Sequence, residues 1–253
     1  MNRKQFIKNS LVGMGVIVAI PTVMQSCSQE DDGITSDDSL STGTNSSTNT
    51  NTNSTTNTST GTDNCTLSPS ETTGPFPIKT PSDLVRENII GDRTGVALLI
   101  TLTIQDQSNS CQPLSGVLVD LWHCDADGNY SEYGGTQMQS TNYTNQHFLR
   151  GRQTTDSNGQ ASFISIFPGW YKGRAPHIHI EILDSNENSI RVTQIAFPKN
   201  ICDTVYATSG YNGEADTSNE SDNVFSDSLD GNILDSITGN TTDGYTLLKT
   251  IVV

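Results

Sequence analysis

Two histidines, His177 and His179, stand two residues apart in a segment where every second residue is isoleucine. Alternate side chains of a β-strand point to opposite faces. The isoleucines therefore predict a buried face, and both imidazoles lie on the other face of the same strand. A strand anchored by buried isoleucines holds two imidazoles in fixed, parallel positions, and this arrangement suits a metal ion.

Two tyrosines precede this strand and carry a second type of ligand atom. Tyr171 lies six residues before His177, in a turn that begins at Pro168, and Tyr130 lies in a turn with Gly128. Phenolate oxygens combined with imidazole nitrogens suit a hard, highly charged cation, so they favour ferric iron over zinc or copper(I). A tyrosine has a pKa of about 10, and its ionisation at neutral pH requires a strong local cation.

The spacing alone leaves a structural interpretation open. Histidines can be surface residues of a β-protein, and tyrosines can be packing residues with hydroxyls at the surface. A cupin metal site also places His-x-His on a strand, but it needs a later carboxylate, and Glu181 follows too closely.

The elements that must position these residues are short strands separated by turns. No long segment shows helical periodicity, and Gly, Asn, Asp and Ser interrupt the chain throughout. This pattern predicts an all-β fold, a β-sandwich of mostly antiparallel strands with long loops at 124–159 and 198–244. The predicted strands are 96–105, 116–123, 160–167, 177–183, 189–197 and 245–253.

The first part of the chain predicts export and anchoring. Residues 1–26 combine a basic start with a short apolar run, as in a signal peptide of the lipoprotein type, and Cys27 follows at the expected cleavage point. Residues 27–64 are predicted to be a lipidated cysteine and a disordered stalk, because 44–60 contains only Ser, Thr and Asn. The folded domain is then 65–253. This organisation predicts an exported protein, lipid-anchored at a bacterial membrane, with the outer membrane or the cell surface as candidate locations.

Charge and cysteines narrow the function class. A formal net charge of −15 disfavours nucleic acid and anionic membrane as partners, so a membrane is expected only through the lipid on Cys27. The acidic residues between Asn200 and Leu248 show no calcium-ligand spacing and predict a solvated surface. An even number of domain cysteines favours disulfides over zinc, with three pairings open. These cysteines are Cys65, Cys111, Cys124 and Cys202.

Several motifs occur in an order that resembles the intradiol ring-cleavage dioxygenases, the protocatechuate and catechol ortho-cleaving enzymes. Leu121–Ala126 further resembles the secreted, single-domain branch of that family. The motifs cover most of the domain, which makes the resemblance specific. They are Thr73–Phe76, Gly128–Tyr130, Thr155–Gly159, Pro168–Tyr171, Arg174–His179, Thr193–Gln194, and Asp216–Asn219 with Asn223–Phe225.

The resemblance implies a site and a reaction. It implies one non-haem Fe(III), with a small aromatic diol and dioxygen as reactants and a muconate-type diacid as the product. Arg174 and Gln194 are implied to lie beside the substrate, and Tyr171 to act as a base as well as a ligand. The implied metal ligands are Tyr130, Tyr171, His177 and His179.

Two features depart from the family or complicate it. Phe76 stands where the family has a tyrosine, so one hydroxyl is missing. Cys124 lies close to Tyr130 in sequence, and because a free thiol can reduce ferric iron, we expect it in a disulfide or turned away.

The alternative function is a surface-anchored, transthyretin-like or carbohydrate-binding β-sandwich module without catalysis.

Overall fold

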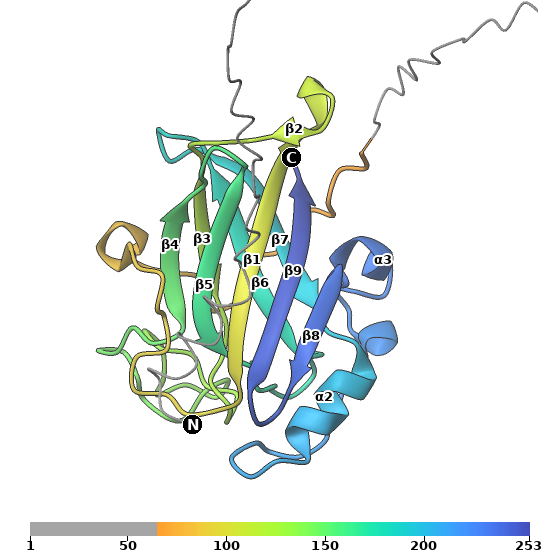
Figure 1. Ribbon diagram of the computed structural model, residues 1–253. Helices are drawn as coiled ribbons and strands as arrows, with labels where there is room; N and C mark the ends of the chain where they lie inside the picture. Colours follow the sequence, from red (N-terminus) through yellow and green to blue (C-terminus); the bar gives the residue numbers. More distant parts are fainter. Residues whose placement is uncertain (1–64) are drawn as a thin grey trace, which may run out of the picture.

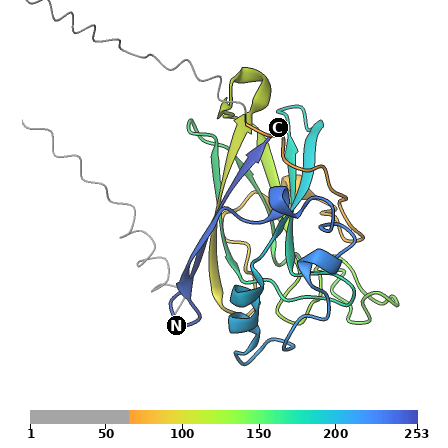
Figure 2. The ribbon, with the colours of Figure 1, turned by 90° about the vertical axis from the view of Figure 1, so that its right-hand side faces the viewer.

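A computed structural model describes residues 65–253, which form two facing β-sheets (Figure 1). One sheet has the order β2-β1-β9-β8, with β5 paired to β1 along the same edge as β2, and the second has the order β4-β3-β6-β7. Figure 2 shows the sheets as separate layers. The strands are β1 (Ala97–Asp106), β2 (Gln112–Pro113), β3 (Leu118–Trp122), β4 (Arg150–Thr154), β5 (Gln160–Ile166), β6 (His177–Leu183), β7 (Ser189–Ala196), β8 (Ser236–Asn240) and β9 (Gly244–Val252). The helices are η1 (Pro81–Leu84), η2 (Gln107–Asn109), α2 (Lys199–Tyr206), η3 (Asn219–Ser221) and α3 (Leu229–Asn232).

The predicted all-β sandwich is confirmed. All strand pairs are antiparallel except the parallel pair β1–β9. The isoleucines of β6, Ile178, Ile180 and Ile182, are fully buried in the core between the sheets. Burying such side chains stabilises the fold by about 1.5–3 kcal/mol each. The period-two pattern of β6 thus places its histidines on the face away from this core.

The two long predicted loops are wrong in part, because they contain β4, β8, α2 and α3. Strand β4 has no alternation of apolar residues. Its arginines, Arg150 and Arg152, are both buried, and Gly151 packs against Ile89. Burial is achieved there by hydrogen-bonded and ion-paired charges, which a hydropathy pattern cannot indicate. Helix α2 has eight residues, too few for a helical period to be evident in the sequence.

The register of the second sheet creates a row of functional side chains. Trp122 of β3 pairs with His179 of β6, and His179 pairs with Gln194 of β7. Directly opposed residues in a sheet point to the same face. The sheet therefore presents an indole, an imidazole and an amide side by side at one level.

The disulfide prediction is only half correct. Cys65 and Cys111 are joined, while Cys124 and Cys202 are free and buried. The bridge closes a loop across a sequence separation of 46 residues. By the chain-entropy estimate, such a loop stabilises the fold by about 4 kcal/mol.

This pairing predicts a thiol count. In a Cys27→Ser variant, two thiols should react after denaturation without reductant, and four after reduction. Counting them with a chromogenic disulfide reagent checks this, and four reactive thiols before reduction would contradict the bridge.

The predicted signal peptide, Cys27 and the stalk lie outside the described residues. Within 65–253, no helix is long and apolar enough to cross a bilayer.

Candidate metal centre

His177 and His179 present their Nε2 atoms to each other at the start of β6. These two nitrogens are 3.1 Å apart, and the Tyr130 hydroxyl lies 3.3 Å from Nε2 of His177. The Nδ1–H of His177 donates to the carbonyl of Ala175 at 2.6 Å. Because a carbonyl can only accept, this bond keeps the His177 proton on Nδ1 and leaves the Nε2 lone pair for a cation.

The His179 ring is oriented by packing. It stacks on Trp122 with an interplanar angle of 2° and a centroid distance of 5.0 Å. Its buried Nδ1 has no hydrogen-bond partner among the described residues. On another side, a Cβ placed on Gly74 would lie 2.9 Å from Cε1 of His179, and Gly74 has a φ of +67°. The ring thus lies between an indole and a backbone segment that only glycine can supply.

The loops that carry Tyr130 and Tyr171 pack backbone against backbone at two glycines, Gly128 and Gly169. A Cβ on Gly128 would lie 2.2 Å from the carbonyl oxygen of Trp170, and one on Gly169 would lie 2.4 Å from the carbonyl oxygen of Asp125. That same carbonyl accepts hydrogen bonds from the backbone N–H groups of both glycines. The backbones therefore approach more closely than any side chain permits, and the two tyrosine rings come within 5.8 Å between centroids.

Burial controls the protonation of the four side chains. It lowers the pKa of His177 to about 3, with Arg174 contributing, and it holds the pKa of His179 well below its usual value. Burial also raises the pKa of Tyr130 well above 10 and that of Tyr171 to about 12, although Arg174 lowers the latter in part. Without a cation, the site therefore contains neutral imidazoles and protonated phenols. A bound cation would displace the phenolic protons.

These donors fit a ferric ion. Ligand atoms about 2.1 Å from one ion are separated by roughly 3 Å, which is the spacing of the two Nε2 atoms and the Tyr130 oxygen. In residues 65–253, no group of three or more His, Cys, Asp and Glu forms a metal cluster. The Tyr130 oxygen lies 3.3 Å from Nε2 of His177, and Tyr171, whose ring lies 5.5 Å from that of His177, is a second phenol beside the histidines. Two imidazoles and two phenolates favour a hard trivalent ion.

The structure brings Arg174 and Gln194 together beside the histidines. Arg174 Nη2 donates to Oε1 of Gln194 at 2.7 Å, and Gln194 Nε2 donates to the carbonyl of Thr72 at 2.8 Å. Gln194 lies opposite His179 in the sheet. The guanidinium charge is thereby held at the edge of the metal centre, where it can stabilise negative charge on a bound ligand.

Asp222 is a site residue that the sequence did not reveal. Its carboxylate is fully buried, and Oδ2 accepts from Nε of Arg174 at 2.8 Å and from the N–H of Ala175 at 2.6 Å. Asp222 thus holds both the arginine and the backbone to which His177 is bonded. Asp222 lies between Asp216–Asn219 and Asn223–Phe225, the two parts of a resembling motif, but nothing in its spacing distinguished this carboxylate from its acidic neighbours.

Phe76 and Cys124 line the other side of Tyr130. The Phe76 ring stacks on that of Tyr130 at 4.7 Å and 25°. The expectation that Cys124 is disulfide-bonded or turned away is wrong: the thiol is free and packs in one cluster with Phe76, Trp122 and Tyr130. Burial raises the Cys124 pKa, which keeps the thiol protonated and weakly reactive.

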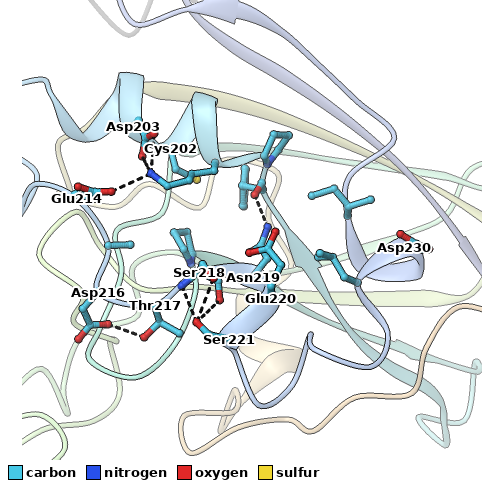
Figure 3. Close-up of a pocket in the computed structure, with 17 residues that line it drawn as sticks. Cys202, Asp203, Glu214, Asp216, Thr217, Ser218, Asn219, Glu220, Ser221 and Asp230 are labelled. Atoms are coloured by element: carbon cyan, nitrogen blue, oxygen red, sulfur yellow. Dashed lines mark hydrogen bonds and ion pairs between the residues drawn. The ribbon is translucent and has the colours of Figure 1, made fainter.

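Two cavities adjoin the centre without containing it. The first, of about 560 Å³, lies between α2 and η3, and its Lys199 is paired with Asp203 and Glu214 (Figure 3). It touches the histidine strand only through Pro176, next to His177. The second, of about 500 Å³, is lined by Phe76, Tyr133, Met138 and other residues of the loop that follows Tyr130.

A third buried histidine makes the fold sensitive to acid. His123 is fully buried, with Nδ1–H donating to the carbonyl of Cys124 at 2.8 Å and Nε2 accepting from the Ser165 hydroxyl at 2.7 Å. Burial lowers its pKa to about 4. Unfolded His123 takes up a proton below about pH 6.5, whereas folded His123 does not. The contribution of His123 to the free energy of unfolding is therefore fully present above pH 6.5. It falls by up to about 1.4 kcal/mol per pH unit between pH 6.5 and 4.

Urea unfolding of metal-free protein between pH 7.5 and 4.5 measures this effect. In His123→Gln, the slope of the unfolding free energy against pH should be smaller by about 1.4 kcal/mol per pH unit, which corresponds to one proton fewer taken up on unfolding. Equal slopes for the two proteins would contradict the assignment.

Comparisons with known proteins show the family to which this chain is similar. The family model described as Dioxygenase matches residues 73–224, which include all six predicted site residues. The structure is similar to an intradiol ring-cleavage dioxygenase from Tetranychus urticae, with 32% identity and a TM-score of 0.65, covering 74% of this chain and 94% of that one. The chain belongs to the intradiol ring-cleavage dioxygenase family.

Curated relatives agree with this family. Over 125 residues the chain is 30% identical to a chlorocatechol 1,2-dioxygenase of Rhodococcus opacus, covering 42% of this chain and 45% of that protein. Over 137 residues it is 28% identical to the protocatechuate 3,4-dioxygenase beta chain of Burkholderia cepacia, covering 51% and 55%. The chain thus spans about half the length of these intradiol dioxygenases.

Proposed function

We propose that the protein is a non-haem ferric dioxygenase that cleaves a small aromatic 1,2-diol between its two hydroxylated carbons to give a muconate-type diacid. The observation that carries this proposal is that Nε2 of His177 lies 3.1 Å from Nε2 of His179 and 3.3 Å from the Tyr130 hydroxyl. The Tyr171 ring packs against the rings of Tyr130 and His177. The Arg174–Gln194 pair beside these ligands supports catalysis rather than a structural metal. Membership of the intradiol family supports the reaction class.

The burial of each tyrosine indicates its role in the proposed reaction. Ferric iron at the four donors supplies a positively charged, electron-accepting centre for an aromatic diol and dioxygen. Tyr130 is fully buried, whereas Tyr171 is partly exposed. Tyr171 is therefore the phenolate whose oxygen can accept a proton from an arriving diol hydroxyl. Arg174, held by Asp222 and Gln194, stabilises the negative charge that this proton transfer leaves on the ring oxygen.

Colour and oxygen consumption test the proposal together. Iron-loaded protein should be burgundy from tyrosinate-to-ferric charge transfer. With catechol, it should consume one dioxygen per diol and form a product with the mass of the substrate plus one dioxygen. Reduction and chelation of the iron should remove colour and activity, and ferric iron should restore both. A preparation that stays colourless after iron loading would overturn the proposal.

We also propose that Cys27 carries a lipid that tethers the domain to a bacterial membrane. Its support is the basic and apolar leader that ends at this cysteine. Detergent-phase partitioning of the exported protein should be lost in Cys27→Ser. Partitioning that persists in the variant would rule out this anchor.

A further inference from the structure

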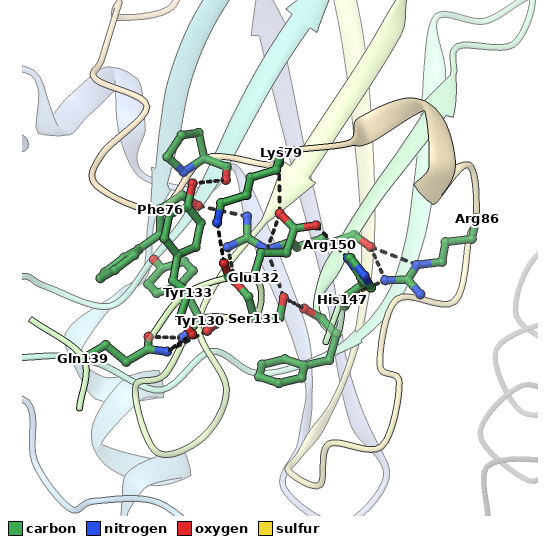
Figure 4. A network of polar contacts seen from close by, with 12 residues as sticks. Phe76, Lys79, Arg86, Tyr130, Ser131, Glu132, Tyr133, Gln139, His147 and Arg150 are labelled. Carbon is green, nitrogen blue, oxygen red and sulfur yellow. Dashed lines mark hydrogen bonds and ion pairs between the residues drawn. The ribbon is translucent and has the colours of Figure 1, made fainter. Parts of the chain in front are cut away.

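We propose that Arg150 is a positioning residue for the metal ligand Tyr130, acting through a buried polar network that no sequence motif indicated. This inference rests on the proposed iron chemistry. Arg150 lies at the start of β4, and its side chain is fully buried. Figure 4 shows it at the centre of a group that includes Tyr130, Ser131, Glu132 and Phe76.

Arg150 holds both segments that enclose Tyr130. On the side of the tyrosine loop, Nη2 donates to the carbonyl of Ser131 at 2.7 Å and Nε donates to the Ser131 hydroxyl at 2.9 Å. On the side of the N-terminal segment, Nη1 donates to the carbonyl of Phe76 at 2.9 Å. One planar guanidinium thus fixes the residue after Tyr130 and the residue whose ring stacks on Tyr130. Lysine cannot reproduce this geometry, because its ammonium is a single point of donation.

The network leaves Arg150 charged and close to the ring. Its counter-ion is Glu132 at 3.6 Å, which is 1% exposed. Glu132 is shared, because Oε2 accepts from the N–H of Lys79 at 2.9 Å and Oε1 accepts from Nδ1 of His147 at 2.8 Å. The guanidinium carbon lies 5.8 Å from the centre of the Tyr130 ring. A buried cation at this distance stabilises negative charge on the ring, and the same contacts limit the directions in which the ring can move.

The backbone of Tyr130 is held independently of Arg150, by the side chain of Gln139. The N–H of Tyr130 donates to Oε1 of Gln139 at 2.7 Å, and Nε2 of Gln139 donates back to the Tyr130 carbonyl at 2.8 Å. Loss of Arg150 should therefore release the ring and the Ser131 side of the loop without unfolding it. The expected result is an iron centre that forms with a displaced Tyr130.

The test compares Arg150→Met with Arg152→Met. Arg152 lies on the same strand, is 3% exposed, and pairs with Asp120 through contacts of 2.6 and 2.8 Å and with Glu187 at 3.2 Å. It pairs across the sheet away from the tyrosine loop, so its loss measures the general cost of removing a buried arginine from β4. Arg150→Lys, which retains the charge, is the second variant in case Arg150→Met does not fold.

Three measurements are made on each purified variant. Arg150→Met should shift the charge-transfer maximum and lower kcat at least tenfold, whereas Arg152→Met should keep the wild-type maximum. Arg150→Lys should show an intermediate shift. In the metal-free proteins, hydrogen exchange of the peptide around residues 127–139 should be faster in Arg150→Met than in Arg152→Met.

The outcomes separate this inference from the proposed function. A colourless wild-type protein would contradict the iron chemistry and leave the exchange measurement to decide whether Arg150 orders the tyrosine loop. A coloured wild type whose maximum, kcat and loop exchange are unchanged in Arg150→Met and Arg150→Lys would overturn the positioning role. Equal effects of Arg150→Met and Arg152→Met would also overturn it, because they would show a purely structural contribution.

Discussion

Replacing Tyr171 with phenylalanine is expected to lower the rate of ring cleavage by about 10²–10⁴-fold, the range typical of a lost general base. The substitution removes one oxygen atom and keeps the ring, which packs against Tyr130, His177 and Phe76. The fold should therefore persist while the proton acceptor and one metal ligand disappear. Stopped-flow rates, iron content and the visible spectrum measure the effect, and a bleached or shifted charge-transfer band should accompany the lost rate.

Tyr143→Phe is the matched control for this experiment. Tyr143 is partly buried and meets the Phe148 ring edge to face, and among the described residues its hydroxyl has a 3.4 Å contact with Arg93. Its loss should leave colour and turnover unchanged. A Tyr171→Phe protein with wild-type kcat would show that Tyr171 neither binds the metal in the active form nor accepts the proton.

Replacing Gly128 with alanine is expected to separate the two tyrosines. At a φ of +85°, any L-residue is strained by about 1–2 kcal/mol, and the new Cβ would also lie 2.2 Å from the Trp170 carbonyl oxygen. The backbone of one loop must move, and Tyr130 or Tyr171 moves with it. We expect the free energy of unfolding to fall by about 3 kcal/mol and iron retention to be lost.

Gly173→Ala isolates the steric part of this effect. Gly173 has the same φ of +85°, but within residues 65–253 an added Cβ there would meet nothing within 4 Å. Both variants therefore carry the left-handed strain, and only Gly128→Ala carries the clash. Urea unfolding and iron content of the two proteins provide the comparison. Equal iron retention would contradict the role of the glycine contact.

The sequence predicted the strands, and it indicated the histidines and tyrosines of the candidate metal centre, where local patterns carry the information. The isoleucine repeat of β6 fixes which face holds His177 and His179, and this pattern is local to seven residues. The tyrosines lie beside glycine turns that the sequence shows directly. The six predicted strands correspond to β1, β3, β5, β6, β7 and β9.

The residues that support the ligands depend on long-range contacts and were missed. Asp222 reaches Arg174 across 48 residues, and Arg150 reaches Phe76 across 74. No periodicity or spacing relates such pairs. A buried charge also contradicts the hydropathy of a core position, so it becomes interpretable only when its partner is known. For the same reason, the free state of Cys124 could not be deduced from an even number of cysteines.

The disulfide at the start of the described chain has a mechanical consequence. The bridge between Cys65 and Cys111 encloses the segment that carries Gly74 against His179 and Phe76 against Tyr130, together with β1. A pulling force applied before Cys65 passes through the sulfur atoms to Cys111 and on into the sandwich. While the bridge is intact, the force is not transmitted along the backbone that carries Gly74 and Phe76, the residues that cover the metal centre. A domain held at its N-terminal end can therefore bear tension without distorting the ligands, and reduction of one bond would transfer that tension directly to the site.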